Sequence, residues 1–162
     1  MRRYVLAALC GLLAATCNLG PLGGTALHGE FVREPMRDWS LVATEYTLDI
    51  QTQAPALLPS ARTWFVVHEG TLWLYAMAPR PLEPSWIRRL RDVDPGVRIR
   101  VGEKLYLAQA RLVEDPAAIE PLLPTLLRKY HMIETARARF IPAPDRYPGT
   151  QLRQWFFRVG VL

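Results

Sequence analysis

An arginine close to a predicted helix start is the most suggestive chemical arrangement in this 162-residue sequence. Arg80 lies in a proline-rich loop, and Ser85 and Trp86 begin the helix that follows the loop. The free N–H groups of a helix start and the fork of a guanidinium both match phosphate oxygens, and an indole ring packs well against a flat molecule. The pattern therefore predicts an anion site at these three residues. The alternative is a solvated arginine, a hydroxyl near a helix start and a core tryptophan.

A second basic stripe runs along a predicted hairpin. Arg98 and Arg100 alternate along its first strand, and Arg111 lies at the end of the second. The stripe either binds an anion across the sheet or pairs with acids on a neighbouring strand, with Asp49 as a possible partner. Three further arginines are expected to form a solvated helix face: Arg88, Arg89 and Arg91.

The sequence lacks the residue sets of acid–base, nucleophilic or metal catalysis. His28, His68 and His131 are isolated from one another, and none has a second ligand at metal-binding spacing. None of the three serines lies in a G-x-S-x-G motif. The pair Gly23-Gly24 does not follow a strand, so a phosphate loop and a dinucleotide fingerprint are both excluded.

Composition indicates one packed domain without a nucleic-acid partner. Half of the residues are apolar and 22% are charged, so a core is expected and disorder is not. Removing Arg2 and Arg3 from the 20 basic residues leaves 18 against 15 acidic ones, which is too even a balance for nucleic-acid binding. The two cysteines, Cys10 and Cys17, lie near the N-terminus, so no disulfide framework is expected in the domain.

Residues 1–24 are interpreted as a signal peptide or lipoprotein leader with a short linker, and residues 25–162 as one domain. A cationic start is followed by the uncharged run Val5–Ala15, and small residues lead into Cys17. Three outcomes stay open: lipidation of Cys17, ordinary cleavage, or an uncleaved membrane anchor. Arg2-Arg3 is also compatible with a twin-arginine signal. The protein is therefore expected to be exported to the cell envelope, either in the periplasm or anchored to the membrane.

Side-chain alternation predicts about seven strands and two helices in the domain. The strand Thr71–Met77 is apolar on both faces, so it needs cover from the barrel interior and from a helix or second subunit. Glu69-Gly70 is expected to join Arg62–His68 to Thr71–Met77 in a tight hairpin. In the hairpin Val97–Leu112, a turn at Gly102-Glu103 places Ile99 opposite Tyr106. Thr25–Arg37 is expected to be a tether. The other expected strands are Asp38–Ala43, Tyr46–Thr52, Arg62–His68 and Gln154–Leu162, and the helices are Ser85–Arg91 and, after a cap at Asp115-Pro116, Leu122–Tyr130.

The order of these elements resembles the split β-barrel flavin-binding superfamily, which includes pyridoxamine-phosphate-oxidase-like proteins and deazaflavin-dependent nitroreductases. The resemblance runs from about Gly29 to the C-terminus, and GEFVREPMRDWS and QWFFRV look like an exported branch of that group. Its motifs are TWFVVHEGTLWLYA (Thr63–Ala76), SWIRRLRDVDPGVRIRVGEKLYLAQARLVEDP (Ser85–Pro116) and LLRKYH (Leu126–His131). The expected fold is thus a β-rich α+β split β-barrel of six to seven mainly antiparallel strands with two short helices.

The resemblance implies a homodimer that holds FMN or a deazaflavin at the subunit interface, with basic residues around the phosphate. Arg62, Arg80, Ser85 and Trp86 fall where such contacts would lie, and Trp64 is a further candidate. The implied function is an exported flavin- or deazaflavin-binding oxidoreductase. The alternative is a non-enzymatic envelope protein of the same fold that binds haem, another planar anionic ligand or no ligand. Where deazaflavin-type members have a G-R-x-S-G turn, this chain has QTQAPALLPSA (51–61).

Overall fold

The computed structural model describes residues 26–53, 60–79, 81–130 and 152–162. The expected leader, including Cys17, and the candidate site residue Arg80 therefore lie outside the described residues. Among the helices of the described ranges, none combines the length and the apolar character that crossing a membrane requires.

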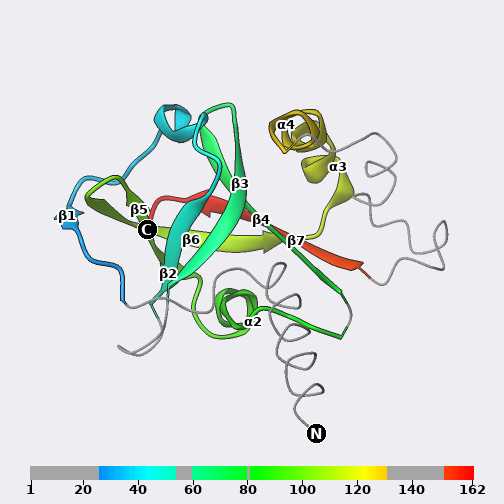
Figure 1. Cartoon of the computed structure of the whole chain (residues 1–162), viewed down its shortest axis with the longest axis horizontal. Coiled ribbons are helices and arrows are strands. Elements are labelled where there is room, and N and C mark those ends of the chain that lie inside the picture. The colour runs from blue at the N-terminus through cyan, green and yellow to red at the C-terminus, as the bar shows by residue number, and fades with distance from the viewer. Residues whose placement is uncertain (1–25, 54–59, 80, 131–151) are drawn as a thin grey trace, which may run out of the picture.

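The described strands form one sheet that closes into a barrel (Figure 1). Its order is β1-β6-β5-β2-β3-β4-β7, and β7 also pairs with β6, so that β2 to β7 make a closed antiparallel ring. β1 lies outside the ring as a parallel partner of β6. The expected β-rich barrel of six to seven mainly antiparallel strands is thus confirmed. The strands are β1 (Glu30–Val32), β2 (Leu48–Thr52), β3 (Ala61–His68), β4 (Thr71–Pro79), β5 (Gly96–Val101), β6 (Lys104–Val113) and β7 (Leu152–Gly160).

Two tight hairpins form where the sequence predicts them. Glu69 and Gly70 join β3 to β4 with φ values of 49° and 71°, and positive φ at both central positions is typical of a type I′ turn. Gly102 and Glu103 join β5 to β6, and the register places Ile99 opposite Tyr106 as expected.

Two helical segments pack on the barrel at separate places (Figure 1). Helix α2 (Ser85–Asp92) follows Pro84 and buries Trp86, Ile87 and Leu90. The second segment comprises α3 (Pro116–Ile119), the 3-10 turn η3 (Glu120–Leu122) and α4 (Leu123–Lys129). Asp115 caps α3 by accepting the N–H of Ala117 at 3.0 Å. Pro121 and Pro124 lie near the starts of η3 and α4, so this segment forms short pieces and not one helix.

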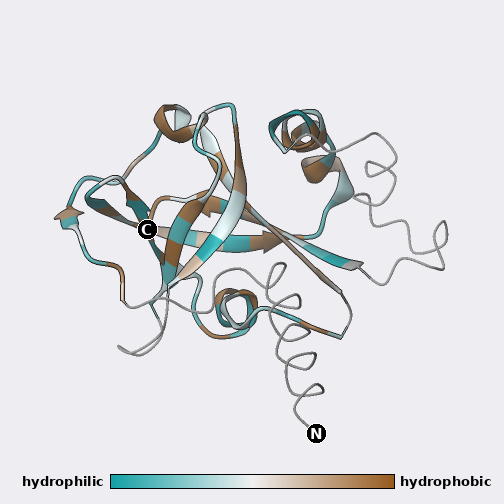
Figure 2. Ribbon diagram, in the orientation of Figure 1, coloured by the Kyte–Doolittle hydropathy of each residue, from teal (hydrophilic) through white to brown (hydrophobic). Residues whose placement is uncertain are grey.

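The two faces of the sheet contribute to two separate hydrophobic cores. The barrel interior contains Leu72, Leu74 and Ala76 of β4, whereas Trp73 and Tyr75 point outward and pack under α3 and α4. Figure 2 shows brown and teal bands along several strands, where hydrophobic and hydrophilic residues alternate. The two-sided burial expected of β4 is confirmed, and the chain's own helices cover its outer face.

The expected strand Asp38–Ala43 is wrong. Residues Ser40–Val42 form a 3-10 turn, η2, which buries Val42 beside Trp39. The Asp38 carboxylate accepts the N–H of Ser40 at 2.9 Å, and such a local side-chain bond competes with a strand ladder. The expected tether Thr25–Arg37 also contains a strand, β1. Finally, β2 begins at Leu48, so Tyr46 is exposed and does not share the buried face.

Candidate functional site

Arg62 lies on β3 and is paired with the chain's own carboxylate. Its Nε donates to Asp49 Oδ1 at 2.8 Å, and Arg100 of β5 donates to the other oxygen of the same carboxylate. The hydrogen bond from Arg62 is the largest effect that lowers the pKa of Asp49. The interpretation that the arginine stripe pairs with Asp49 is confirmed for Arg100.

The two candidate tryptophans lie in different cores. Trp64 stacks on Tyr75 with ring centroids 5.9 Å apart, on the outer face of the sheet beside α4. Trp86 is 8% exposed and packs against Phe157 in the barrel core, with ring centroids 5.7 Å apart. The structure therefore does not bring Trp64 and Trp86 together around one slot.

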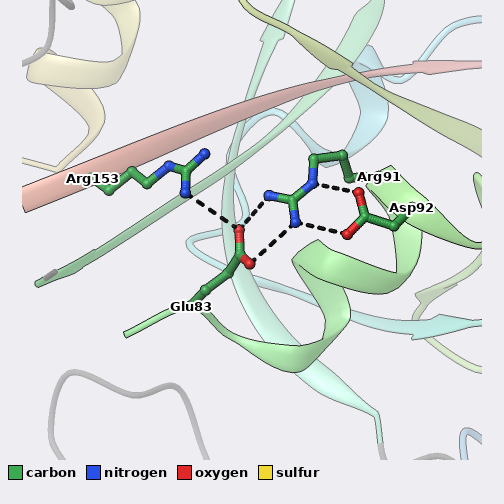
Figure 3. A network of polar contacts seen from close by, with 4 residues as sticks. All are labelled: Glu83, Arg91, Asp92 and Arg153. Carbon is green, nitrogen blue, oxygen red and sulfur yellow. Dashed lines mark hydrogen bonds and ion pairs between the residues drawn. The ribbon is translucent and has the colours of Figure 1, made fainter. Parts of the chain in front are cut away.

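The anion site predicted at the start of α2 already has a carboxylate, Glu83, close to its arginines. Ser85 is exposed, and Glu83 two residues earlier accepts from Arg91 at 2.6 Å and lies 4.0 Å from Arg153. Figure 3 shows Glu83 between these two arginines, with Asp92 on the other side of Arg91. An added anion at this helix start would compete with Glu83 for the same guanidinium groups.

A hollow of about 630 Å³ lies elsewhere, where β7 ends, β4 begins and the segment before η2 passes. Its volume falls within the range of roughly 300–1,000 Å³ that is usual for small-molecule sites. The strand residues in its lining come from β4, β6 and β7. The lining residues are Met36, Arg37, Trp39, Thr71, Gln109, Arg111, Val113, Arg158, Val159, Gly160 and Val161.

Three arginines give this hollow its charge. Arg111 of β6 and Arg158 of β7 are register partners, directly opposite each other across the β6–β7 ladder, and Arg37 comes from the segment before η2. None of the lining residues is acidic, and among the described residues no acid forms an ion pair with any of the three. Like charges directly opposite on a sheet are destabilising, so this arrangement favours an anion between them. We call these three residues the arginine cluster.

Within the described ranges, Arg111 and Arg158 contact neutral groups. Arg111 Nη2 donates to Gln109 Oε1 at 3.0 Å, and the Arg158 guanidinium lies 6.0 Å from the centre of the Trp73 ring. Trp39, which is 3% exposed, adds an apolar wall to the hollow. Arginine forks beside an apolar wall are suited to a phosphate or carboxylate group carried on a flat molecule.

The arrangement supports binding and gives no sign of acid–base or metal chemistry. The lining of the hollow contains no histidine, cysteine or carboxylate. No group of three metal-ligating side chains occurs within residues 26–53, 60–79, 81–130 and 152–162.

Arg37 and Arg158 were not among the candidate residues predicted from the sequence, and the structure does not bring Arg111 together with Arg98 and Arg100. Arg98 lies 5.4 Å from the Phe31 ring and Arg100 binds Asp49, both away from the β6–β7 ladder. The local signal was present, because Arg158 interrupts an aromatic strand at a position that must point outward. The pairing of β6 with β7, which decides its partner, is not visible in local sequence.

Lys129 at the end of α4 is half-buried, and its ammonium group is shielded from solvent. Its Nζ lies 3.4 Å from the centre of the Phe65 ring and has no hydrogen-bond acceptor among the described residues. Burial lowers the pKa of Lys129 to about 8, against a smaller opposing effect of Glu45. The pKa of lysine in an unfolded chain is about 10.4, so between these two pKa values the folded chain binds fewer protons than the unfolded chain. Lys129 therefore makes stability rise with pH in that window.

We expect Lys129→Met to raise the free energy of unfolding at neutral pH and to flatten this rise with pH. Methionine keeps the length of the side chain and removes the buried charge. Urea denaturation at several pH values from neutral to about 10 measures both effects. Lys104→Met is the matched control, because Lys104 is the chain's other lysine and is exposed on β6. Parallel curves for wild type and Lys129→Met would contradict the prediction.

The closed antiparallel barrel is compatible with a split-barrel fold. No protein-family model matches the sequence, and no curated protein matches it.

Proposed function

We propose that this chain is an exported split-barrel protein that binds a flat, phosphate-bearing ligand of the flavin or deazaflavin class and acts as an oxidoreductase through it. The observation that carries the proposal is the arginine cluster. In it, Arg111 and Arg158 lie opposite each other, the lining contains no acid, and Trp39 is part of the lining. The order of hairpins and helices around the barrel agrees with the family that the sequence resembles.

The residues of the hollow have separate roles in this proposal. Arg111 and Arg158, with Arg37, would hold the phosphate, and the accessible apolar residues of the lining, Met36 and Val161, would contact the flat ring. A flavin, when bound, supplies the electron- and hydride-transfer chemistry. The chain's own residues bind and orient the ligand, because the lining brings no acid–base group to it.

A second candidate is an envelope protein of the same fold that binds haem or another planar anion without redox activity. This candidate is favoured by the positions of Trp64 and Trp86, each of which packs against the chain's own aromatic rings and not around a shared slot. Recognition would then rest on the anionic group alone. We also propose that the protein is a homodimer, which light scattering of the purified chain tests.

The deciding experiment is an absorption spectrum of the purified mature chain, followed by titration with FMN, a deazaflavin and haem. We expect bound FMN to show the two bands of an isoalloxazine, and Arg158→Gln to weaken its binding about 10- to 100-fold, because a charge-assisted hydrogen bond is lost. Arg62→Gln is the matched control, since Arg62 is paired with Asp49, and it should leave the affinity unchanged.

Three results would change the proposal. No binding of FMN or deazaflavin overturns the flavin assignment, and a Soret band on titration with haem supports the second candidate. Weakening by Arg62→Gln with no effect of Arg158→Gln would place the ligand at the residues predicted from the sequence. The mass of the mature N-terminus tests export and decides whether Cys17 is lipidated.

A further inference from the structure

The β6–β7 ladder is the seam that joins the last strand to the barrel, and its two faces differ sharply. Five residue pairs hold it, from Gln109 opposite Gly160 to Val113 opposite Phe156. On the inner face Ala110 and Val159 are buried in the barrel core. On the outer face Arg111 lies opposite Arg158. The seam is thus held by apolar burial on its inner face, whereas on its outer face the apolar pair Val113 and Phe156 lies next to the like-charged pair Arg111 and Arg158.

We propose that the occupant of the hollow is a phosphate dianion, as a phosphate monoester, a diphosphate group or free phosphate, and that its binding stabilises this seam. The inference rests on the site of the proposed function but does not require the ligand to be a flavin. It assigns the arginine cluster a second role, in which the ligand's phosphate tightens the closure of the barrel.

The charge count favours a dianion over a monoanion. The hollow has three guanidinium groups and no lining carboxylate, so a single negative charge would leave two of the three unbalanced. A phosphate monoester carries about −1.5 to −2 charges near neutral pH and offers three acceptor oxygens. Arginine forks bind such oxygens in pairs.

The present positions of the two seam arginines show how they would respond. Arg111 donates a hydrogen bond to Gln109 on its own strand, and the guanidinium of Arg158 lies over the ring of Trp73 on β4. Both contacts are with neutral groups, so a bound dianion would compete successfully for both guanidinium groups. Arg37 would then connect the segment before η2 to the same anion.

The test compares the full mature chain in inorganic phosphate and in sodium chloride at equal ionic strength. We expect phosphate to raise the unfolding midpoint, because only the folded seam binds the anion. At a phosphate concentration of ten times the Kd, amide hydrogen exchange in β7 should slow about tenfold. Arg158→Gln should not lower the midpoint in chloride, since it removes a like-charge contact, and it should abolish the response to phosphate. Arg88→Gln, on the exposed side of α2, is the matched control and should respond as the wild type does.

Two outcomes overturn the inference: equal midpoints and equal β7 exchange in the two salts, or an undiminished phosphate response in Arg158→Gln. The result is separable from that of the flavin titration. If phosphate protects β7 but FMN does not bind, the proposed stabilisation of the seam stands and the flavin proposal fails. If FMN binds but β7 is not protected, the flavin proposal stands and the proposed stabilisation of the seam fails.

Discussion

Replacing Tyr130 with phenylalanine is expected to lower the free energy of unfolding by about 2–4 kcal/mol, because it leaves two buried backbone groups without partners. The Tyr130 hydroxyl accepts the N–H of Phe65 at 2.9 Å, and its oxygen lies 2.8 Å from the Phe65 carbonyl oxygen and 3.0 Å from that of Tyr46. The tyrosine is 8% exposed, so water does not readily replace it.

The position of this hydroxyl explains its importance. The β2–β3 ladder has only three residue pairs, the last being Leu48 with Thr63, and the chain then diverges. At Phe65, where β2 no longer pairs with β3, the Tyr130 hydroxyl accepts the backbone hydrogen bond that a neighbouring strand would accept. This bond links the end of α4 to the barrel. Burial raises the pKa of Tyr130 to about 12, so the hydroxyl keeps its proton throughout the neutral range.

Urea denaturation at neutral pH measures the effect. Tyr46→Phe is the matched control: the Tyr46 ring lies 5.0 Å from that of Tyr130, but Tyr46 offers only its backbone oxygen to the hydroxyl. We expect Tyr46→Phe to retain nearly full stability because its side chain is exposed. A loss of less than about 0.5 kcal/mol in Tyr130→Phe would show that the gap between β2 and β3 is solvated.

The parts of the fold that depend on neighbouring residues were predictable from the sequence. Both hairpins follow from a two-residue turn between alternating strands, and the register at Ile99 and Tyr106 follows from the turn position. The segment at Asp38 was not predictable in this way. Its residue types suit a strand, but one carboxylate bond to the Ser40 N–H and one backbone bond from Trp39 to Gly70 turn it across the barrel.

The arginine cluster depends on pairings between distant segments, which is why it was not predicted from the sequence. Asp49 could be predicted as a partner for Arg100 because the two side chains carry opposite charges on neighbouring strands, and the structure places them opposite each other. The meeting of Arg111 and Arg158 requires β7 to join β6, and no local pattern in either strand specifies that neighbour. Fold was therefore easier to predict than site, because a strand's alternation shows which face is buried but not which strand lies beside it.

The second large effect is expected at Asp49, where one carboxylate holds two arginines on the outer face of the barrel. Its side chain is 16% exposed, while those of Arg62 and Arg100 are 53% and 37% exposed. An exposed ion pair contributes about 0–1 kcal/mol, and breaking a buried one costs about 3–5 kcal/mol. Asp49 lies between these cases. We therefore expect Asp49→Asn to lower the free energy of unfolding at neutral pH by about 1–2 kcal/mol.

The pH dependence provides a sharper test than the loss itself. The pKa of Asp49 in the folded chain lies below its unfolded value, mainly because of the hydrogen bond from Arg62. Its contribution to stability is then complete above about pH 5 and is lost as the pH falls through the folded-state pKa. The curves of wild type and Asp49→Asn, measured by urea denaturation, should be separated at neutral pH and converge in acid. Asp92→Asn, with a more exposed ion pair on α2, should give a much smaller separation. A constant gap at every pH would mean that the amide disrupts packing, and that the charge of Asp49 does not hold the two arginines.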